Sequence, residues 1–321
     1  MCIRDSHATA QNHAAGFAKL VEKYPNDQAA LKAVEWIMQR APSGPAADRA
    51  ISALGKDVVK SREVLGLCRT LRRRADENSE TLLQRIIDNN PHRDVQGQAR
   101  YAQCLNLKTS FDEESPSDEA ARLGKELEAQ LVELSEKYGD IKDLDRTLKE
   151  SAASLLFEIR FLSIGSRPPD IVGEDLEGKP LKLSEFRGKV VMLVFWGTWC
   201  GPCMAAVPEH LAILRKHEGK PLAIVGINSD EDRTTAATVA TEKGITWRSW
   251  WDKSTRGPIA TRWNVHSWPT IYLLDATGTI RYKGDMLRAV SVRRNADGKL
   301  EQISFLEDHV DELVKETVAG N

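Results

Sequence analysis

The sequence predicts an all-α, repeat-like helical domain followed by an α/β domain whose mixed central sheet is flanked by helices. Apolar residues recur at helical spacing through residues 7–162, whereas from residue 163 onward buried, β-branched runs alternate with helical segments. A chain of 321 residues, with 41% hydrophobic and 29% charged residues, has the length and composition of two globular domains. We therefore expect domains at residues 7–162 and 163–321.

The charge and hydropathy of the chain exclude some classes of partner. The formal net charge is -2, so bulk electrostatics favour neither nucleic acid nor an anionic membrane. No apolar run approaches the roughly 20 residues that cross a bilayer. We expect a soluble globular chain without a nucleic-acid partner.

Residues 1–6, "MCIRDS", also match the translated end of a common transposon-based sequencing adapter. We expect a library scar there and exclude it from the fold prediction; a native start is the alternative. On this hypothesis Cys2 has no function. The signal region and any membrane tether are then missing together with the native N-terminus.

Three amphipathic segments characterise the first half. "FAKLVEKY" places Phe17, Leu20 and Val21 on one helical face, and "LKAVEWIM" and "SETLLQRIIDNNP" repeat that spacing. Pro25 and Pro91 each lie between a helix end and a further Ala-containing helix. We expect helical hairpins with a weak similarity to tetratricopeptide repeats.

The rest of the first half alternates between loop and helix. Residues 108–120, "KTSFDEESPSDEA", read as a polar loop. A long amphipathic pair is expected after it, at roughly residues 118–138 and 142–162. No motif in these segments identifies a ligand. We therefore predict only that this domain offers a binding surface to a protein partner.

The second half has the pattern of an α/β sheet. "GKVVMLVFW" (188–196) and "PLAIVGIN" (221–228) are continuous apolar runs, typical of strands buried on both faces. Helices are expected from Cys203, over "DEDRTTAATVATEKG" with Asp230 as N-cap, and over "SFLEDHVDELVKETV". Residues 270–284 read as a strand hairpin.

The segment "WCGPC" stands where a buried strand runs into a helix. The N-terminus of that helix carries unpaired N–H groups and the positive end of the dipole, which stabilise a thiolate. Cys200, at the exposed edge of the turn, is predicted to be the attacking sulfur and Cys203 the resolving one. Pro202 preorganises the first turn, and Gly201 and Trp199 are expected to support the site.

Two other interpretations of the cysteine pair fit the sequence less well. A zinc site needs about four ligands, and His210, His217 and His266 lack the spacing of a second pair. Two buried structural thiols would not need Gly-Pro between them or a tryptophan before them. We therefore predict a redox couple, with no metal and no cofactor beyond the disulfide itself.

"HSWPT" supplies a second candidate element. An X–Pro bond just before a strand is a suitable place for a cis peptide, and we predict one at Pro269. Facing the cysteine loop, a cis proline would offer a flat surface for the extended backbone of a client. An ordinary loop proline is the alternative.

Together these residues resemble the thioredoxin superfamily and, more narrowly, the TlpA/ResA-like thiol–disulfide oxidoreductases. "GSRPPDIVGEDLEGKPLKLSEFRGKVVMLVFWGTWCGPC" is similar to the opening of that family, which AhpC/TSA-type redoxins share, and "WPTIYLLDATGTIRYKG" is similar to its closing half. The resemblance covers residues 163–321. The Trp-rich segment after residue 246 looks like planctomycete-type members, which carry an N-terminal helical extension.

The resemblance implies a thioredoxin-like fold and a dithiol–disulfide exchange with protein clients, within cell redox homeostasis and antioxidant activity. It implies an upstream electron donor or acceptor and an extracytoplasmic location, periplasmic or membrane-tethered. Cys200 and Cys203 carry over as the redox pair, and Pro269 as the cis proline. Gly-Pro between the cysteines is the dipeptide of reducing thioredoxins, so the reductase direction is favoured.

Two positions depart from that family. Val194 replaces the buried Asp of thioredoxins, and Ala206 replaces the Glu that ResA-like proteins often keep. Either carboxylate could accept the proton of the resolving thiol. Glu209 is the acidic residue nearest to the cysteine pair in sequence. Charged residues on helices are mostly solvated, so we expect Glu209 to be a surface residue. We expect water to serve as the base.

Other residues have a packing and a functional interpretation. Cys68 and Cys104 lie on apolar helix faces and are expected in the core, with a disulfide between them as the alternative. Trp199 and Trp268 flank the proposed site and are candidates for a client groove. His266 is a candidate for tuning the Cys200 thiolate, with a solvated loop histidine as the alternative.

The sequence leaves two alternative functions open. A peroxiredoxin-like thiol peroxidase shares the opening motif, but its reactive cysteine lies in a Pro/Thr-rich loop that "FWGTWC" lacks. Catalytic consumption of peroxide would favour it. The other rival is a helical interaction scaffold with an appended redox domain.

Overall fold

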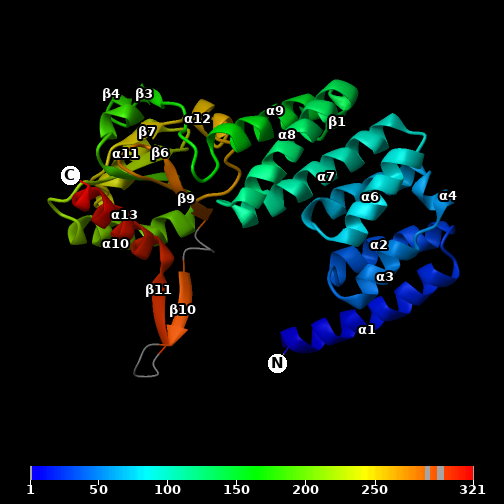
Figure 1. The fold of residues 1–321 in the computed structure, drawn as a ribbon. Coiled ribbons are helices and arrows are strands. Elements are labelled where there is room, and N and C mark those ends of the chain that lie inside the picture. The colour runs from blue at the N-terminus through cyan, green and yellow to red at the C-terminus, as the bar shows by residue number, and fades with distance from the viewer. Residues whose placement is uncertain (1, 286–289, 295–299, 321) are drawn as a thin grey trace. The chain divides into compact units, whose positions relative to one another are not determined.

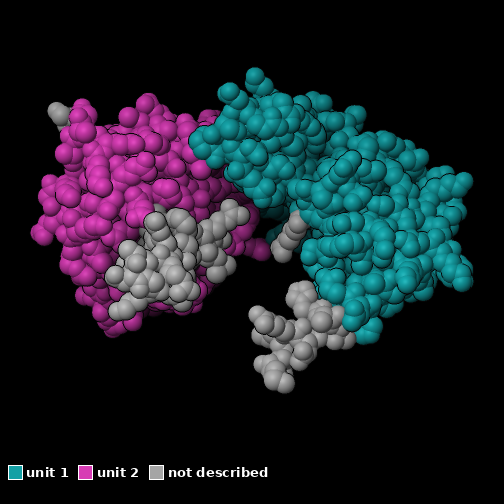
Figure 2. Space-filling model, turned by 60° about the horizontal axis from the view of Figure 1, so that its bottom comes forward, with its two compact units in different colours: residues 1–156 teal, residues 157–321 magenta. Residues whose placement is uncertain are grey.

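In the computed structural model, residues 2–285, 290–294 and 300–320 are described. Figure 1 draws the fold, and Figure 2 colours its two units, residues 1–156 and 157–321. The division falls inside helix α9 (Leu148–Phe161), a little before the boundary expected at residue 162.

Unit 1 is helical apart from a short hairpin. Its elements are α1 (Cys2–Lys23), α2 (Gln28–Arg40), α3 (Pro45–Ala53), α4 (Lys56–Val59), η1 (Arg62–Val64), α5 (Leu65–Thr70), η2 (Leu71–Arg73), α6 (Glu77–Asn89), α7 (Arg93–Glu114), α8 (Asp118–Tyr138), β1 (Lys142–Asp143), β2 (Arg146–Thr147) and the first turns of α9. Apolar stripes of α1, α2, α3 and α6 form one buried cluster, which includes Val21, Val34, Ile51 and Leu83. The helical repeat stays a prediction.

Two expectations for unit 1 were wrong. Residues 108–114 continue α7, because Phe111 is buried and Lys108 pairs with Asp112 at 2.5 Å along the helix. The segment from residue 142 begins as the β1–β2 hairpin, whose turn residue Leu144 has a φ of 57°. Tertiary burial in the first case and turn geometry in the second outweigh the polar and helical patterns.

Unit 2 contains a five-stranded mixed sheet in the order β7-β6-β5-β8-β9. Its strands are β5 (Val190–Trp196), β6 (Leu222–Asn228), β7 (Ser249–Trp251), β8 (Thr270–Leu274) and β9 (Ile280–Asp285). β6 runs parallel to β5, and β8 runs antiparallel to it. The predicted mixed sheet flanked by helices is confirmed.

The remaining elements of unit 2 lie outside this sheet. They are β3 (Val172–Glu174), β4 (Pro180–Lys182), η3 (Leu183–Phe186), α10 (Gly201–Lys216), α11 (Arg233–Glu242), α12 (Pro258–Arg262), β10 (Val290–Arg294), β11 (Leu300–Ser304) and α13 (Phe305–Ala319). β10 and β11 form a separate antiparallel hairpin, and Figure 1 shows α10 and α13 on the same side of the sheet.

Strand β5 is buried along its whole length and contributes side chains to two hydrophobic clusters, one on each face of the sheet. Val190, Met192 and Val194 face a cluster that includes residues of α10 and α13. Val191 and Leu193 face the opposite cluster, with residues of α12. Because both faces are covered, the strand carries no polar residue.

A helix that spans a membrane has to be both long and apolar. None of the helices in the described part of the chain meets both requirements.

His210 gives unit 2 a specific pH dependence. Its side chain is buried on α10 against Trp247, with ring centroids 5.9 Å apart. Burial lowers the pKa of His210 from 6.5 to about 4. The unfolded chain therefore takes up a proton between these values and the folded chain does not, so stability falls as the pH falls through that window.

We predict that the free energy of unfolding drops by up to ~3 kcal/mol between about pH 6.5 and pH 4 because of this group. His210→Leu should remove that part of the pH dependence. Urea unfolding followed by tryptophan fluorescence measures it, since seven of the eight tryptophans lie in unit 2. An equally steep pH dependence in the variant would contradict the assignment.

Candidate functional site

The two cysteines form a disulfide at the junction of β5 and α10. Cys200 is the N-cap residue of α10 and Cys203 lies in its first turn, with their Cα atoms 5.2 Å apart. The helix begins at Gly201, two residues earlier than expected. Gly201 and Pro202 form its exposed first turn, and the proline lacks the N–H that would have no partner there.

The helix N-terminus is directed at the sulfur of Cys200. The backbone N–H of Cys203 donates to Cys200 Sγ at 3.1 Å. After reduction the same donor, together with the helix dipole, would stabilise a thiolate at Cys200 more than at Cys203. The local geometry therefore favours Cys200 as the nucleophile.

The expectation that Cys200 lies at an exposed edge was wrong. Cys200 is 4% exposed and Cys203 is 3% exposed. Both pack in the cluster that contains Val194 and Trp196, because α10 lies directly on that face of the sheet. By contrast, the neighbouring Trp199 is 53% exposed.

The second predicted element lies beside the disulfide. The Trp268–Pro269 peptide bond is cis, as the sequence predicts. Pro269 immediately precedes β8, and Phe195 of β5 pairs with Thr270 of β8. This register brings the cis proline to the end of β5 from which the cysteine loop leaves.

The aromatic residues proposed for a client groove come together. The rings of Trp199 and Trp268 meet edge to face with centroids 5.7 Å apart. His266 is exposed, and its Nε2 bonds to Oδ1 of Asn264 at 2.8 Å. The client groove and a tuning role for His266 stay predictions.

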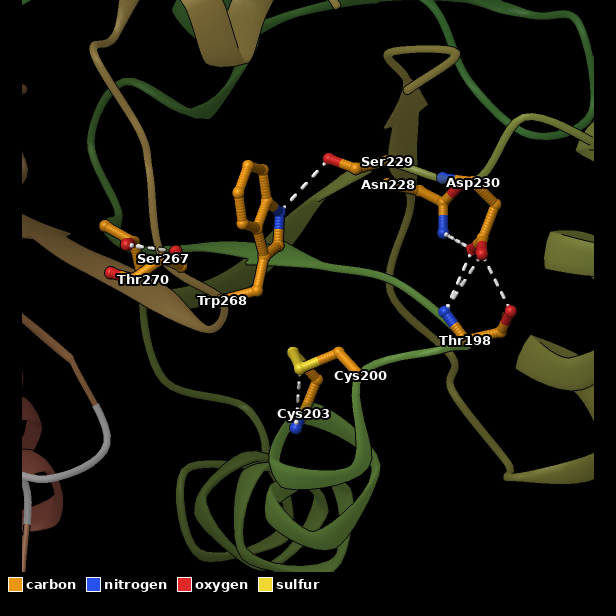
Figure 3. Close-up of a disulfide and its surroundings, with 9 residues drawn as sticks. All are labelled: Thr198, Cys200, Cys203, Asn228, Ser229, Asp230, Ser267, Trp268 and Thr270. Carbon is orange, nitrogen blue, oxygen red and sulfur yellow. Dashed lines mark hydrogen bonds between the residues drawn. A yellow bond between two sulfur atoms is a disulfide. The ribbon is translucent and has the colours of Figure 1, made fainter. Parts of the chain in front are cut away.

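A polar turn that the sequence does not reveal lies beside the disulfide. Asp230 was expected to cap the helix after β6, but Asp232 is the N-cap of α11 and Asp230 instead accepts hydrogen bonds from Thr198. Ser229 Oγ accepts from Trp268 Nε1 at 3.1 Å. Figure 3 shows the turn between these two partners.

The two departures from the family pattern are occupied by apolar side chains. Val194 and Ala206 are both buried, so neither position supplies a carboxylate to the resolving thiol. Glu209 lies half-buried on α10. Water as the base for Cys203 stays a prediction.

The other two described thiols lie in unit 1. Cys68 and Cys104 are free and fully buried, as expected of core residues. Burial raises the pKa of each thiol to about 12. Among the residues that the structure describes, no three His, Cys, Asp or Glu side chains are grouped as a metal site requires.

Comparisons with known proteins agree with this geometry. Residues 164–283 match the AhpC/TSA family. The thiol-disulfide oxidoreductase ResA of Bacillus thuringiensis subsp. konkukian is 33% identical over 119 residues, 37% of this chain and 68% of the relative. The chain belongs to the ResA-like thiol–disulfide oxidoreductases.

A second relative and two solved structures are also similar to this chain. A ResA of Bacillus cereus is 29% identical over 143 residues, covering 44% of this chain and 80% of the relative. The thioredoxin domain of a thiol-disulfide oxidoreductase from Bacteroides vulgatus is 25% identical, with a TM-score of 0.39 over 47% of this chain and 98% of that one. A secreted thiol-disulfide isomerase from Corynebacterium glutamicum is 24% identical, with a TM-score of 0.37 over 47% of this chain and 84% of that one.

Family and site together establish the class of activity. The protein is a thiol–disulfide oxidoreductase of thioredoxin-like fold, with a CxxC disulfide between Cys200 and Cys203. A helical unit precedes its redox unit.

The thiols should differ sharply in reactivity. After reduction with dithiothreitol, a short pulse of iodoacetamide at pH 7 should modify Cys200 first. Cys68 and Cys104 should stay unmodified until urea is added, because burial raises the pKa of both thiols to about 12. Peptide mass spectrometry identifies the modified cysteines. Labelling of Cys68 or Cys104 in the folded protein would contradict the prediction.

Proposed function

We propose that the chain reduces disulfides of protein clients through Cys200 and Cys203 and needs no cofactor besides this pair. The observation that carries the proposal is the N–H of Cys203 pointing at Cys200 Sγ, 3.1 Å away, at a helix N-terminus beside a cis proline. The same contact supports the assignment of Cys200 as nucleophile and Cys203 as resolving residue.

The reaction runs in two exchanges. The Cys200 thiolate attacks a client disulfide, forms a mixed disulfide and releases one client sulfur as a thiolate that takes up a proton. Cys203 then loses its proton to water and attacks Cys200 Sγ. The second client sulfur leaves as a thiolate that takes up a proton, the Cys200–Cys203 disulfide forms, and two electrons have passed to the client.

An upstream dithiol must regenerate the reduced pair. Its thiolate would attack the Cys200–Cys203 disulfide by the same chemistry in reverse, so its reduction potential has to be lower than that of this pair. We place this exchange outside the cytoplasm, as the family resemblance implies.

Clients are proposed to bind along Trp199, Trp268 and Pro269. Trp199 is 53% exposed and meets Trp268 edge to face. The rings offer apolar area beside a disulfide that is itself recessed. An extended client segment could pair its backbone at the cis proline while its disulfide enters from above Cys200.

The Cys203→Ser variant should trap a client. Without the resolving thiol the mixed disulfide on Cys200 cannot be released, so a covalent adduct should accumulate and disappear on treatment with dithiothreitol. Non-reducing electrophoresis and mass spectrometry identify the adduct. Trapping by Cys200→Ser and none by Cys203→Ser would reverse the assignment of the two sulfurs.

Unit 1 is proposed to bind a protein partner or client. A groove of about 1160 Å³ opens on this unit, and Arg69, Arg72, Arg74 and Lys108 contribute to its lining. Carboxylates already pair with these cations, including Asp143 with Arg72 at 2.7 Å. These ion pairs offset the positive charge of the groove lining.

Removing unit 1 tests this role. A chain of residues 157–321 should keep exchange with small disulfides, since both cysteines and their core lie in unit 2. It should trap fewer or different clients than the full chain when both carry Cys203→Ser. Identical clients at identical rates would refute the recruitment role.

A further inference from the structure

The turn Asn228–Asp230, which begins at the last residue of β6, contacts the segments on both sides of the disulfide. Its Asp230 holds the loop that leads to Cys200, and its Ser229 holds the indole of Trp268. Figure 3 shows these contacts converging on one turn. Neither contact belongs to the exchange chemistry itself.

Both carboxylate oxygens of Asp230 accept hydrogen bonds. Oδ1 accepts from Thr198 N at 3.1 Å and from Thr198 Oγ1 at 2.7 Å, while Oδ2 accepts from Thr198 N at 3.0 Å and from Asn228 Nδ2 at 2.6 Å. Asp230 is only 5% exposed. Two acceptor oxygens are needed because donors approach both of them, and an amide would offer one oxygen and one NH₂ group.

The turn is itself fixed to the neighbouring strands. Ser229 N donates to Trp196 O at 2.9 Å, at the end of β5. On the other side, Trp251 Nε1 donates to Asp230 O at 2.8 Å, at the end of β7. The Asp230 carboxylate oxygens that accept hydrogen bonds from Thr198 are therefore fixed to the sheet and do not lie on a free loop.

The loop held by Asp230 sets the position of the nucleophile. Thr198 is two residues before Cys200, and Cys200 N donates to Gly197 O at 3.1 Å in the same tight turn. A shift of Thr198 would move Cys200 relative to the N–H of Cys203. The charge-assisted bonds at Asp230 oppose that shift.

The contact at Ser229 acts on the other wall of the site. Ser229 Oγ accepts from Trp268 Nε1 at 3.1 Å, and Trp268 immediately precedes the cis Pro269. The same indole meets Trp199 at 5.7 Å. Ser229 thus orients the ring on which the proposed client surface depends.

We propose that this turn positions both halves of the redox site: Asp230 aligns Cys200 for attack, and Ser229 aligns Trp268 for client binding. Both are positioning residues, since neither touches a reacting sulfur. The inference rests on the proposed disulfide reductase function. It divides the two steps of that function between neighbouring residues.

Steady-state reduction of insulin by dithiothreitol through the protein separates the two effects. Asp230→Asn should lower kcat about 10-fold, because small misplacements of a reacting group are costly, and leave KM within about twofold. Its new N–H₂ group would face the side-chain N–H₂ of Asn228. Ser229→Ala should raise KM about fivefold, the scale of one lost hydrogen bond, with a smaller change in kcat.

Two further variants control the experiment. Asp232→Asn makes the same substitution two residues along the chain, at the N-cap of α11, and should leave both constants unchanged. Asn228→Asp added to Asp230→Asn restores a donor–acceptor pair between the two side chains. The double variant should recover most of the lost kcat.

Variants are compared only where near-ultraviolet circular dichroism shows a native fold, and the milder Thr198→Val covers the case in which Asp230→Asn does not fold. Equal effects of Asp230→Asn and Asp232→Asn, or no separation of kcat from KM, would overturn the positioning roles. A wild-type protein that reduces insulin no faster than dithiothreitol alone would instead refute the proposed function.

Discussion

The register of β5 with its two neighbours is the constraint on which the site depends. Phe195 pairs with Thr270 of β8, and Trp196 pairs with Asn228 of β6. The cysteine loop, the cis-proline loop and the polar turn after β6 therefore lie at the same end of these three strands. A slip by one residue would turn the apolar side chains of β5 to the wrong faces and also separate these three loops.

Two opposing effects act on the sulfurs of Cys200 and Cys203 at this end of the sheet. The helix N-terminus favours the charged form of Cys200, and the apolar cluster around both cysteines disfavours any charge. The N–H of Cys203 donates to Cys200 Sγ, whereas Cys203 itself lies within the first turn of α10, in the same apolar cluster as Val194. This difference supports Cys200 as the proposed nucleophile and Cys203 as the proposed resolving residue.

Local patterns predicted much of this structure, and tertiary contacts decided the rest. The buried strands, the cysteine pair and the cis proline each occupy a short, distinctive segment, so the sequence was sufficient. The role of Asp230 was not predictable, because its donor Thr198 is 32 residues away and Asp232 makes an equally good cap. Likewise, α7 extends through a polar stretch because Phe111 packs against other parts of the unit.

The burial of Cys68 and Cys104 acquires a meaning from the order of the chain. During synthesis, residues 1–156 leave the ribosome before Cys200 exists, and domains tend to fold in that order. The helical unit can therefore enclose its own thiols before a reactive disulfide is present in the same molecule. Folding in that order would enclose Cys68 and Cys104, whose burial raises the pKa of both thiols to about 12, before they could exchange with Cys200 and Cys203.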